Sequence, residues 1–282
     1  ARSNGSYVSR AGKGTKYLPE DHKSTPDTVW NYYGISNEEA QKAGMNSKMF
    51  NSFLDGTKSS LEMAAIANAC ELSVPENGLL FPPCGMDDLA SILKPKQSGG
   101  ILTHNGQVEV VSSLERDGRP VFKDLRWGVY AVLQAPNDYA ASCFKQYGMN
   151  TDESGEYSAM YKPFHLIGME LNISVFSAAL LNQPTGQTKT FAGDVVATAK
   201  RYLQKGEVLD GEGGSTVWGK LIPSKTSLSI GALPIGLAHN IKLNKNINED
   251  QIINWDDVDF NIKDETINYR KQMEKDFKSL LV

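Results

Sequence analysis

The chain has 282 residues, of which 40% are hydrophobic and 22% are charged, a composition typical of soluble globular proteins and not of disordered ones. Its length is enough for one large domain or two ordinary ones. The formal net charge of -4 gives no general reason to bind nucleic acid or an anionic membrane. No run of basic residues with interleaved aromatic residues is present either. We therefore expect neither kind of partner.

The cysteines and the first residues indicate the compartment. Cys70, Cys84 and Cys143 are odd in number and far apart, without a CxxC pair, so a disulfide framework or a zinc site is not expected. No apolar run reaches the roughly 18 residues of a membrane span. The start, Ala1–Val8, has no apolar core of a secretion signal. We expect a cytoplasmic protein whose first ten residues resemble the cut end of a longer chain.

The first part of the chain is expected to change from turns to helices. Residues 1–35 are polar and turn-rich, and we interpret them as a linker from, or a remnant of, a preceding domain. Ser36 and Glu39 form a capping-box pattern, which predicts a short helix ending near Gly44. Apolar residues at helical spacing then predict a longer helix over about Ser47–Leu72, weakened in its middle by a glycine.

The middle of the chain predicts an α+β domain. Val108–Leu114 and Val121–Leu133 are rich in β-branched and aromatic residues, and the Asp-Gly step between them favours a hairpin. Asn137–Tyr147 is predicted to be a short helix, and Phe164–Leu181 a largely apolar, buried one. Together with the preceding helices, residues 36–188 are expected to form a catalytic, substrate-binding domain with a mixed or antiparallel sheet.

The last third is predicted to be a small, mostly β module followed by a helix. From about Thr190, short strand-like pieces alternate with glycine-rich turns. We place this module at 189–262 and an amphipathic C-terminal helix at 263–282. The predicted strands are Val195–Ala199, Thr216–Leu221, Leu228–Ile230, Ile241–Leu243 and Ile252–Trp255, and the helix has Tyr269, Met273, Phe277 and Leu281 at four-residue spacing.

One cluster that could carry chemistry is Asp55, Lys58 and Glu62. On a single helix their spacing of three and four would place them on one face. Lys58 could then donate the proton that a hydride transfer to a carbonyl requires. The two carboxylates could instead hold Mg²⁺ or Mn²⁺. The alternative is a solvated face with ordinary ion pairs, which are common on exposed helices.

Two further groups could bind a substrate. In Tyr161-Lys-Pro-Phe-His165, the histidine precedes an apolar helix, where its neutral form is favoured and could hydrogen-bond a carbonyl or phosphate oxygen. A histidine bonded to backbone at the edge of the core is an equally good interpretation. Arg126, on a predicted strand, could grip a phosphate or carboxylate bidentately, although a structural ion pair is the default.

The segment Gly12-Lys13-Gly14-Thr15-Lys16 combines two glycines, which allow close approach of the backbone to a ligand, with two positive charges. It is not a P-loop, because the spacing and the Gly-Lys-[Ser/Thr] ending are wrong. By itself this pattern is weak.

Taken together, several segments resemble the homoserine-dehydrogenase-like oxidoreductases, the family that includes the 1-deoxy-D-xylulose 5-phosphate reductoisomerase-like enzymes. The final third is similar to the SAF-type β module of that family. The segments of the first part are Ala11-Gly-Lys-Gly-Thr-Lys-Tyr17, Ser24-Thr-Pro-Asp-Thr-Val-Trp30, Phe50-Asn-Ser-Phe-Leu-Asp-Gly-Thr-Lys58, Phe81-Pro-Pro-Cys-Gly85, Val108-Glu-Val-Val-Ser-Ser-Leu114, Arg126-Trp-Gly-Val-Tyr130 and Phe164-His-Leu-Ile-Gly168; those of the last part are Asp194-Val-Val-Ala-Thr-Ala-Lys200, Gly236-Leu-Ala-His239 and Trp255-Asp-Asp-Val258.

The sequence also departs from this family. Its members carry an N-terminal Rossmann domain with a G-x-G-x-x-G/A turn, and this chain has no such turn. Ala1–Arg10 occupies the place where that domain would end. We therefore expect this chain to be incomplete, with most of the NADP(H) site outside it. We expect NADP(H) to bind it less tightly than a complete enzyme, and the chain alone to be inactive.

The resemblance implies the substrate-binding part of an NAD(P)H-dependent oxidoreductase or reductoisomerase that acts on a small hydroxy-carbonyl compound, phosphorylated or free. Homoserine dehydrogenase proper is one alternative, and a non-catalytic SAF-type protein that binds a carbohydrate or a partner is another. A homodimer is expected, built by the C-terminal helix or by the mid-chain hairpin.

Each candidate residue takes a role in this interpretation. The carbonyl is polarised or protonated by Lys58 and His165. Substrate or a divalent cation is bound by Asp55 and Glu62. The anionic group of the substrate is received by Lys13, Lys16 and Arg126, and Tyr161 contacts the substrate. Gly12 and Gly14 allow the cofactor to approach the backbone.

Overall fold

The computed structural model describes residues 5–261 and 263–280 and divides the chain into two compact units. Unit 1 is made of residues 5–18, 65–75 and 79–190. Unit 2 is made of residues 19–64, 76–78 and the described residues from 191 onward. Helix α4 (Thr57–Cys70) contributes its first part to unit 2 and its last part to unit 1.

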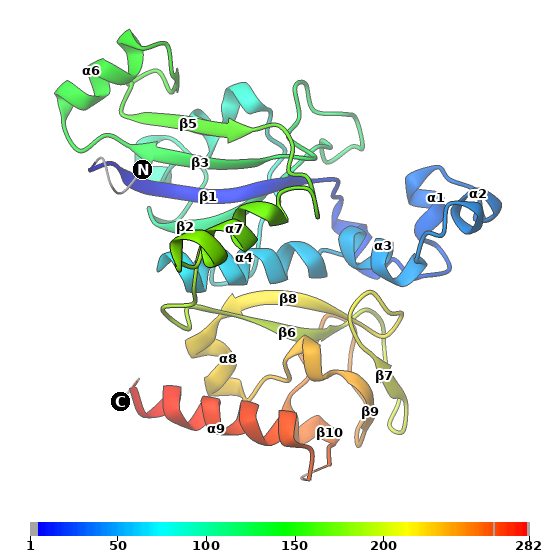
Figure 1. The fold of residues 1–282 in the computed structure, drawn as a ribbon. Coiled ribbons are helices and arrows are strands. Elements are labelled where there is room, and N and C mark those ends of the chain that lie inside the picture. Colours follow the sequence, from blue (N-terminus) through cyan, green and yellow to red (C-terminus); the bar gives the residue numbers. More distant parts are fainter. Residues whose placement is uncertain (1–4, 262, 281–282) are drawn as a thin grey trace. The chain divides into compact units, whose positions relative to one another are not determined.

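Unit 1 is built on a mixed sheet of five strands in the order β2-β1-β3-β5-β4 (Figure 1). The first strand pairs in parallel with β2 and antiparallel with β3, and the remaining pairs are antiparallel. The α+β class expected from the sequence is confirmed. The strands are β1 (Tyr7–Thr15), β2 (Gln107–Ser112), β3 (Val129–Gln134), β4 (Asn150–Thr151) and β5 (Tyr157–Lys162).

One face of this sheet carries the core of unit 1. Because side chains alternate along a strand, Tyr130 and Val132 of β3 point to the same face as Ala159 of β5, and all three pack with Leu89 and Leu93. The helices of unit 1 besides the end of α4 are η3 (Met86–Asp88), α5 (Leu89–Ile92), η4 (Lys96–Ser98), α6 (Asp138–Gln146) and α7 (Leu171–Leu181).

The Gly-Lys-Gly segment, which lies in the part of the chain predicted to be turn-rich, is part of strand β1, an inner strand of the sheet. The expected mid-chain hairpin is also wrong, because β2 and β3 both pair with β1 and not with each other. The residues that flank the Asp-Gly turn form only an isolated antiparallel bridge, between Leu114 and Pro120. Residues 121–128 form turns before β3 begins, so the predicted strand is wrong in its first half.

The apolar helix predicted over Phe164–Leu181 differs from the prediction in two ways. It begins only at Leu171, after a turn that contains His165. It is also exposed along its whole length, with Leu180 77% and Leu171 61% exposed, so the expectation of a buried helix is wrong. Within the described part of the chain, no helix combines the length and the apolar character that crossing a membrane requires.

Unit 2 combines two small antiparallel sheets with helices: β6 pairs with β8, and β9 lies between β10 and β7. The strands are β6 (Gly193–Ala199), β7 (Val208–Asp210), β8 (Val217–Pro223), β9 (His239–Leu243) and β10 (Val258–Asp259). The helices besides α4 are η2 (Pro19–Lys23), α1 (Val29–Tyr33), α2 (Asn37–Lys42), α3 (Ser47–Leu54), α8 (Ser224–Ile230), η5 (Ile235–Leu237), η6 (Trp255–Asp257) and α9 (Glu265–Leu280).

Several local predictions for unit 2 can be compared directly. The capping box of Ser36 and Glu39 is confirmed at the start of α2. The predicted strand at Leu228–Ile230 is wrong, because these residues end helix α8. The segment Ile252–Trp255 contributes isolated bridges and the start of η6 instead of a strand. The predicted C-terminal helix is confirmed as α9, while Leu281 lies outside the described residues.

The long helix predicted over Ser47–Leu72 is two helices, α3 and α4. The chain breaks between them at Asp55 and Gly56, and this glycine has a φ of 89°, which favours glycine over other residues. Asp55 ends α3 and its Oδ1 accepts a hydrogen bond from the amide of Thr57 at 2.9 Å. The expected common helix face of Asp55, Lys58 and Glu62 is therefore wrong.

Candidate functional site

Asp55 lies at the centre of a buried polar cluster in unit 2. Its side chain is 0% exposed, and its Oδ2 accepts a hydrogen bond from Lys200 Nζ at 2.8 Å. The same ammonium donates to the carbonyl oxygens of Ser24 and Gly214, each at 2.7 Å. All three N–H donors of Lys200 are thus used inside the protein. Both oxygens of Asp55 are used as well, one by Lys200 and the other by Thr57.

A histidine extends this cluster. Nδ1 of His22 lies 2.7 Å from the carbonyl oxygen of Asp55, and its ring stacks on Trp218 at a centroid distance of 3.7 Å. Burial lowers the pKa of His22, and burial also lowers the pKa of Lys200 while the nearby Asp55 opposes the change. The arrangement holds the end of α3 and the end of β6 together within unit 2.

Sequence reasoning missed Lys200 and His22. Lys200 directly follows the apolar run Val195–Ala199, which is buried as strand β6. A lysine at the end of a fully buried strand must find an acidic partner or remain close to water. This signal was available in the sequence, but its partner Asp55 is 145 positions away.

Lys58 and Glu62 do share one face of α4. Their side chains form an ion pair of 2.8 Å at i,i+4 spacing and are 35% and 27% exposed. This geometry leaves both groups in contact with solvent, as catalytic or binding groups must be. It also fits the alternative of an ordinary surface pair.

The carboxylates of Asp55 and Glu62 do not fit a divalent cation. Both Asp55 oxygens accept hydrogen bonds inside the protein, and Glu62 pairs with Lys58. Throughout residues 5–261 and 263–280, no three His, Cys, Asp or Glu side chains come together in a way that could hold a metal ion. The expected Mg²⁺ or Mn²⁺ site is not formed by these residues.

In unit 1, the strand register places two lysines on the face of the sheet opposite the core. Lys13 lies directly opposite Val129, and Val129 lies directly opposite Lys162. Residues opposite each other on antiparallel strands point to the same face, so the two lysines are two strands, or about 10 Å, apart. Lys162 forms an ion pair with Glu170. We call the side chains of Lys13, Val129 and Lys162 the basic row.

His165 and Arg126 lie near the same end of the sheet. The amide N and the Nδ1 of His165 are both in hydrogen-bond contact with the carbonyl oxygen of Trp127, at 3.0 and 2.9 Å. A carbonyl only accepts, so Nδ1 carries the proton and Nε2 is the nitrogen that can accept one. The guanidinium of Arg126 lies over the Trp127 ring at 4.6 Å. The expected helix N-terminus at His165 is absent, since α7 begins at Leu171.

Tyr161 and Lys16 take different positions. Tyr161 lies opposite Tyr130, whose ring is in the core, so Tyr161 points to the other face of the sheet from the basic row and is 42% exposed. Lys16 follows the last residue of β1 and is half-buried. The structure therefore brings Lys13, Arg126 and His165 to one end of the sheet, with Tyr161 on its opposite face.

Gly12 and Gly14 are explained by packing within unit 1. A Cβ at Gly12 would overlap the carbonyl oxygen of Glu109 and lie 2.8 Å from the Tyr130 hydroxyl. A Cβ at Gly14 would overlap the carbonyl oxygen of Leu125. The space that a side chain would occupy at each glycine is thus filled by the protein's own backbone. These glycines therefore leave no room for a dinucleotide.

We expect Gly14→Ala to destabilise unit 1 by about 1–3 kcal/mol, because the added methyl group has no room against a rigid backbone. Gly186→Ala is the matched control in the same unit, since a Cβ there meets nothing within 4 Å. Thermal unfolding of the two variants checks this. Equal melting temperatures would contradict the packing explanation.

Glu109, on β2, is a second buried ionisable group of unit 1. It is 0% exposed and accepts hydrogen bonds from the amides of Val110 at 2.8 Å and Leu80 at 3.1 Å. Burial raises the pKa of Glu109 to about 7, although these hydrogen bonds and the nearby Arg10 act against the rise. Burial also lowers the pKa of Arg10 to about 10.

The raised pKa of Glu109 predicts a pH-dependent stability. Between its ordinary value of 4.5 and about 7, the folded state keeps a proton that the unfolded state has released. The free energy of unfolding should therefore fall by on the order of 3 kcal/mol as pH rises through this window. Glu109→Gln, uncharged at every pH, should remove the fall, whereas the exposed control Glu153→Gln should keep it. Urea unfolding at several pH values measures this, and an unchanged slope in Glu109→Gln would refute it.

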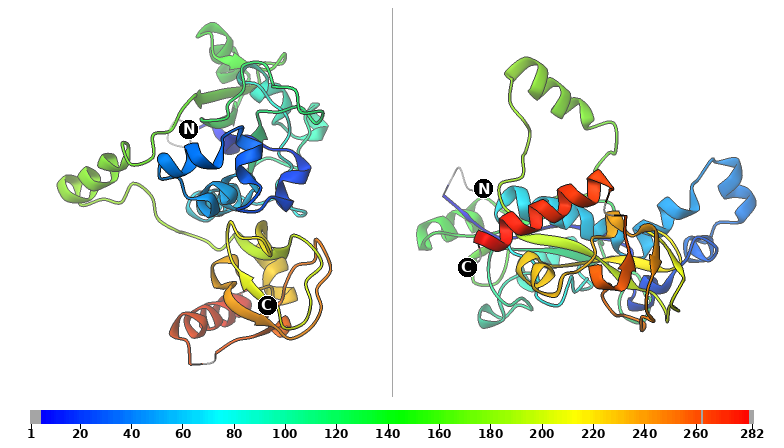
Figure 2. Two further views of the ribbon diagram at one scale, coloured as in Figure 1. Left: turned by 90° about the vertical axis from the view of Figure 1, so that its right-hand side faces the viewer. Right: turned by 90° about the horizontal axis from the view of Figure 1, so that it is seen from below.

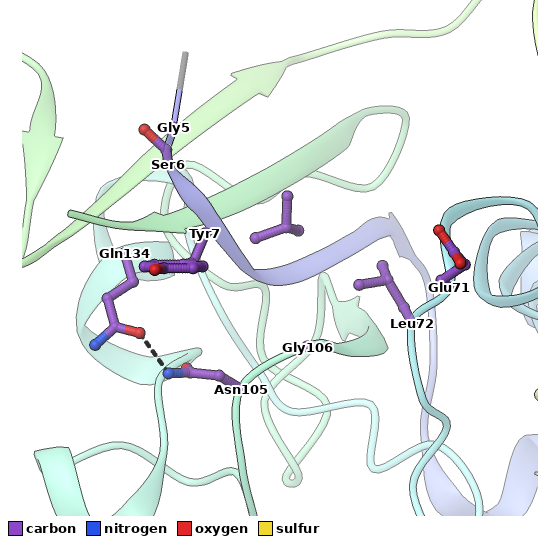
Figure 3. Close-up of a pocket in the computed structure, with 9 residues that line it drawn as sticks. Gly5, Ser6, Tyr7, Glu71, Leu72, Asn105, Gly106 and Gln134 are labelled. Carbon is purple, nitrogen blue, oxygen red and sulfur yellow. Dashed lines mark hydrogen bonds between the residues drawn. The ribbon is translucent and has the colours of Figure 1, made fainter. Parts of the chain in front are cut away.

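A hollow of about 670 Å³ opens at the other end of β1 (Figure 3). Its polar lining includes Asn105 and Gln134, which are joined by a hydrogen bond of 2.6 Å, and the carboxylate of Glu71. The described residues that line it include no lysine, arginine or histidine. The basic row lies at the opposite end of the same strand, so this hollow is not the place for an anionic group.

Comparison with known proteins identifies a family for the first part of the chain. Residues 1–171 match the family model described as "Oxidoreductase DRL, catalytic domain". No match is found among curated proteins. The matched residues cover more than half of the chain and include β1 to β5. The chain belongs to the oxidoreductase DRL catalytic-domain family.

Proposed function

We propose that this chain binds and positions a small anionic hydroxy-carbonyl substrate for reduction or reductive rearrangement, in the manner of a 1-deoxy-D-xylulose 5-phosphate reductoisomerase-like enzyme. The observation that carries the proposal is the basic row of Lys13, Val129 and Lys162, together with Arg126 and His165 near the same end of the sheet. A small apolar residue between two ammonium groups gives space for a phosphate or carboxylate.

The chemistry of these groups supports an anionic substrate. Ammonium groups on a rigid strand bind an anion without the loss of freedom that a loop would suffer. A nicotinamide cofactor would supply the hydride, and the described residues around Gly12 and Gly14 form no site for it. In this proposal Lys13 and Arg126 hold the anionic group, and Lys16 adds positive charge at the end of β1.

Within unit 1, proton supply is assigned to His165. Nδ1 of His165 is held by the Trp127 carbonyl, so Nε2 is the atom that would take up and return a proton. Lys58 belongs to unit 2, and its role as a proton donor, with an ammonium that Glu62 orients across one turn of α4, stays a prediction from the sequence. Asp55 acts as a positioning residue that holds the ends of α3 and β6 together. Both of its carboxylate oxygens already accept hydrogen bonds within unit 2.

Steady-state kinetics tests this proposal. The chain is first joined to a Rossmann nucleotide-binding domain, which supplies the NADP(H) site. Oxidation of NADPH is then followed with 1-deoxy-D-xylulose 5-phosphate, and reduction of NADP⁺ with homoserine. Lys13→Ala and Lys162→Ala should raise KM about 10- to 100-fold, the loss of one charge-assisted hydrogen bond each. Lys96→Ala, exposed in the same unit, is the control. Turnover of homoserine but not of the phosphorylated ketone, or unchanged KM in the row variants, would overturn the proposal.

A further inference from the structure

An asparagine that precedes a glycine is a chemically reactive point in a protein chain, and this chain has three such steps. They are Asn4-Gly5, Asn77-Gly78 and Asn105-Gly106. Because glycine has no side chain, its backbone nitrogen can closely approach the side-chain carbonyl carbon of the preceding asparagine. Asn4 lies outside the described residues. The other two steps have the same pair of residues in different surroundings, so they can be compared directly.

The step at Asn105 is held by hydrogen bonds on each group that would have to react. Its Oδ1 accepts from the hydroxyl of Ser9 at 2.6 Å, and its Nδ2 donates to Oε1 of Gln134 at 2.6 Å (Figure 3). The backbone nitrogen of Gly106 donates to the carbonyl oxygen of Ser9 at 2.9 Å. For this nitrogen to reach Cγ of Asn105, all three hydrogen bonds must break.

The step at Asn77 has no such restraint. Residues 76–77 form a turn, and Asn77 is exposed. Among the described residues, neither the side chain of Asn77 nor the backbone nitrogen of Gly78 has a hydrogen-bond partner. Gly78 has a φ of 90°, which favours glycine over other residues. The turn itself therefore calls for the residue that makes the step reactive.

We propose that Asn77 is a modification site of this chain, deamidated through a cyclic succinimide, whereas Asn105 is protected by its hydrogen bonds. The backbone nitrogen of Gly78 loses its proton and forms a bond to Cγ of Asn77. The bond from Cγ to the side-chain nitrogen breaks, and this nitrogen takes up a proton and leaves as ammonia. Water then opens the ring at one of its two carbonyl carbons and gives aspartate or isoaspartate. Water is the only co-reactant, and the inference does not depend on the substrate of the chain.

Three hydrogen bonds are sufficient to separate the two steps. Each one is expected to lower the population of reactive conformations at Asn105 about fivefold. Together they predict that Asn77 reacts on the order of 100-fold faster than Asn105 in the folded chain.

Exposure alone does not make such a site. Asn182 is exposed at the end of α7, the light green helix that stands off from the rest of unit 1 in Figure 2. The next residue is Gln183, whose side chain hinders the approach of its own backbone nitrogen. This nitrogen also donates a hydrogen bond to the carbonyl oxygen of Ser177 at 3.2 Å. We expect Asn182 to stay unmodified while Asn77 reacts.

The isoaspartate product changes the backbone as well as the charge. Both products add one negative charge to the turn, and isoaspartate also lengthens the main chain before Gly78 by one carbon. A Cβ at Gly78 would lie 3.1 Å from Cε of Lys220 and 3.4 Å from the carbonyl oxygen of Leu221, so there is little room for the added carbon. The isoaspartyl chain should unfold at a lower temperature than the wild type. Asn77→Asp has the same charge on a normal backbone, and its unfolding temperature should be nearly unchanged.

Peptide mapping by mass spectrometry tests the proposal on the folded chain, incubated at mildly alkaline pH. The peptide that contains Asn77 should gain the mass difference between an amide and a carboxyl group, and the peptide that contains Asn105 should keep its mass over the same period. Asn77→Gln is the matched variant, because it keeps the amide but would have to close a larger ring. It should stay unmodified.

The role of the fold is tested in two ways. In the chain unfolded by urea the hydrogen bonds are lost, so Asn77 and Asn105 should react at similar rates. In the folded chain, Gln134→Ala removes the partner of Nδ2 and should speed the reaction at Asn105 about fivefold. Glu153→Ala, exposed in the same unit, should leave this rate unchanged.

Three results would contradict the proposal. They are a folded chain in which Asn77 stays unmodified, equal rates at Asn77 and Asn105 in the folded chain, and a difference between the two rates that persists in urea. The last result would assign the difference to the neighbouring sequence instead of the fold.

Discussion

Replacing Asp55 by alanine is expected to lower the free energy of unfolding of unit 2 by about 3–5 kcal/mol, because it leaves the ammonium of Lys200 buried without its counter-ion. Lys200 is 2% exposed, and its remaining contacts are carbonyl oxygens, which do not neutralise its charge. Denaturant unfolding followed by tryptophan fluorescence measures the change.

The controls for this prediction come from the same unit. Lys200→Met should be destabilising to a similar extent, and the double variant Asp55→Ala/Lys200→Met should lose clearly less than the sum of the two single losses. Glu62→Ala, which removes the partly exposed pair with Lys58, should lose less than about 1 kcal/mol. If Asp55→Ala lowered the free energy of unfolding no more than Glu62→Ala does, the buried ion pair would not be what anchors α3 to β6.

The second large effect is expected at Lys58. If its ammonium donates the proton during reduction of the carbonyl, Lys58→Ala should lower kcat by about 10²- to 10⁴-fold while KM changes little. The folded state should be unaffected, because the side chain is partly exposed and its ion pair contributes little. Steady-state turnover of the phosphorylated ketone by the chain joined to a nucleotide-binding domain measures this.

A matched lysine makes the result for Lys58 interpretable. Lys225 is an exposed lysine of α8 in the same unit, and Lys225→Ala should retain full turnover. Lys58→Arg should not restore it, because a guanidinium does not release its proton. Full turnover in Lys58→Ala would leave Lys58 and Glu62 as an ordinary surface pair.

The elements with strong local signals could be predicted from the sequence. Helix α2 has its capping box, Asn137 caps α6, and the β-branched runs mark β6 and β8. Helix α8 was predicted in part as a strand, since Leu228-Ser-Ile230 alternates apolar and polar residues, and three residues are too few to distinguish a strand from a helix.

Strand β1 could not be predicted, because its glycines are explained only by distant neighbours. Gly12 and Gly14 favour a turn when considered locally. In the fold they allow close contact with the backbone at Glu109 and Leu125, about a hundred residues later in the chain. The same limit applies to Asp55, whose partner Lys200 is supplied by β6.

The candidate site was predicted in part. Lys13, Arg126 and His165 were identified from residue type, and the structure brings them to one end of the sheet. Lys162 was part of a quoted motif but was given no role, because its position beside Lys13 depends on the register of β1, β3 and β5. A register between distant strands cannot be inferred from local spacing.

The central claim is that the basic row receives the anionic group of the substrate, and a calorimetric titration tests it most directly. The chain is titrated with 1-deoxy-D-xylulose 5-phosphate and with 1-deoxy-D-xylulose, for the wild type and for Lys13→Ala. We predict that the wild type binds the phosphorylated compound at least tenfold more tightly and that Lys13→Ala loses most of this preference. Equal affinities in the wild type, or a preference that survives in Lys13→Ala, would contradict the claim.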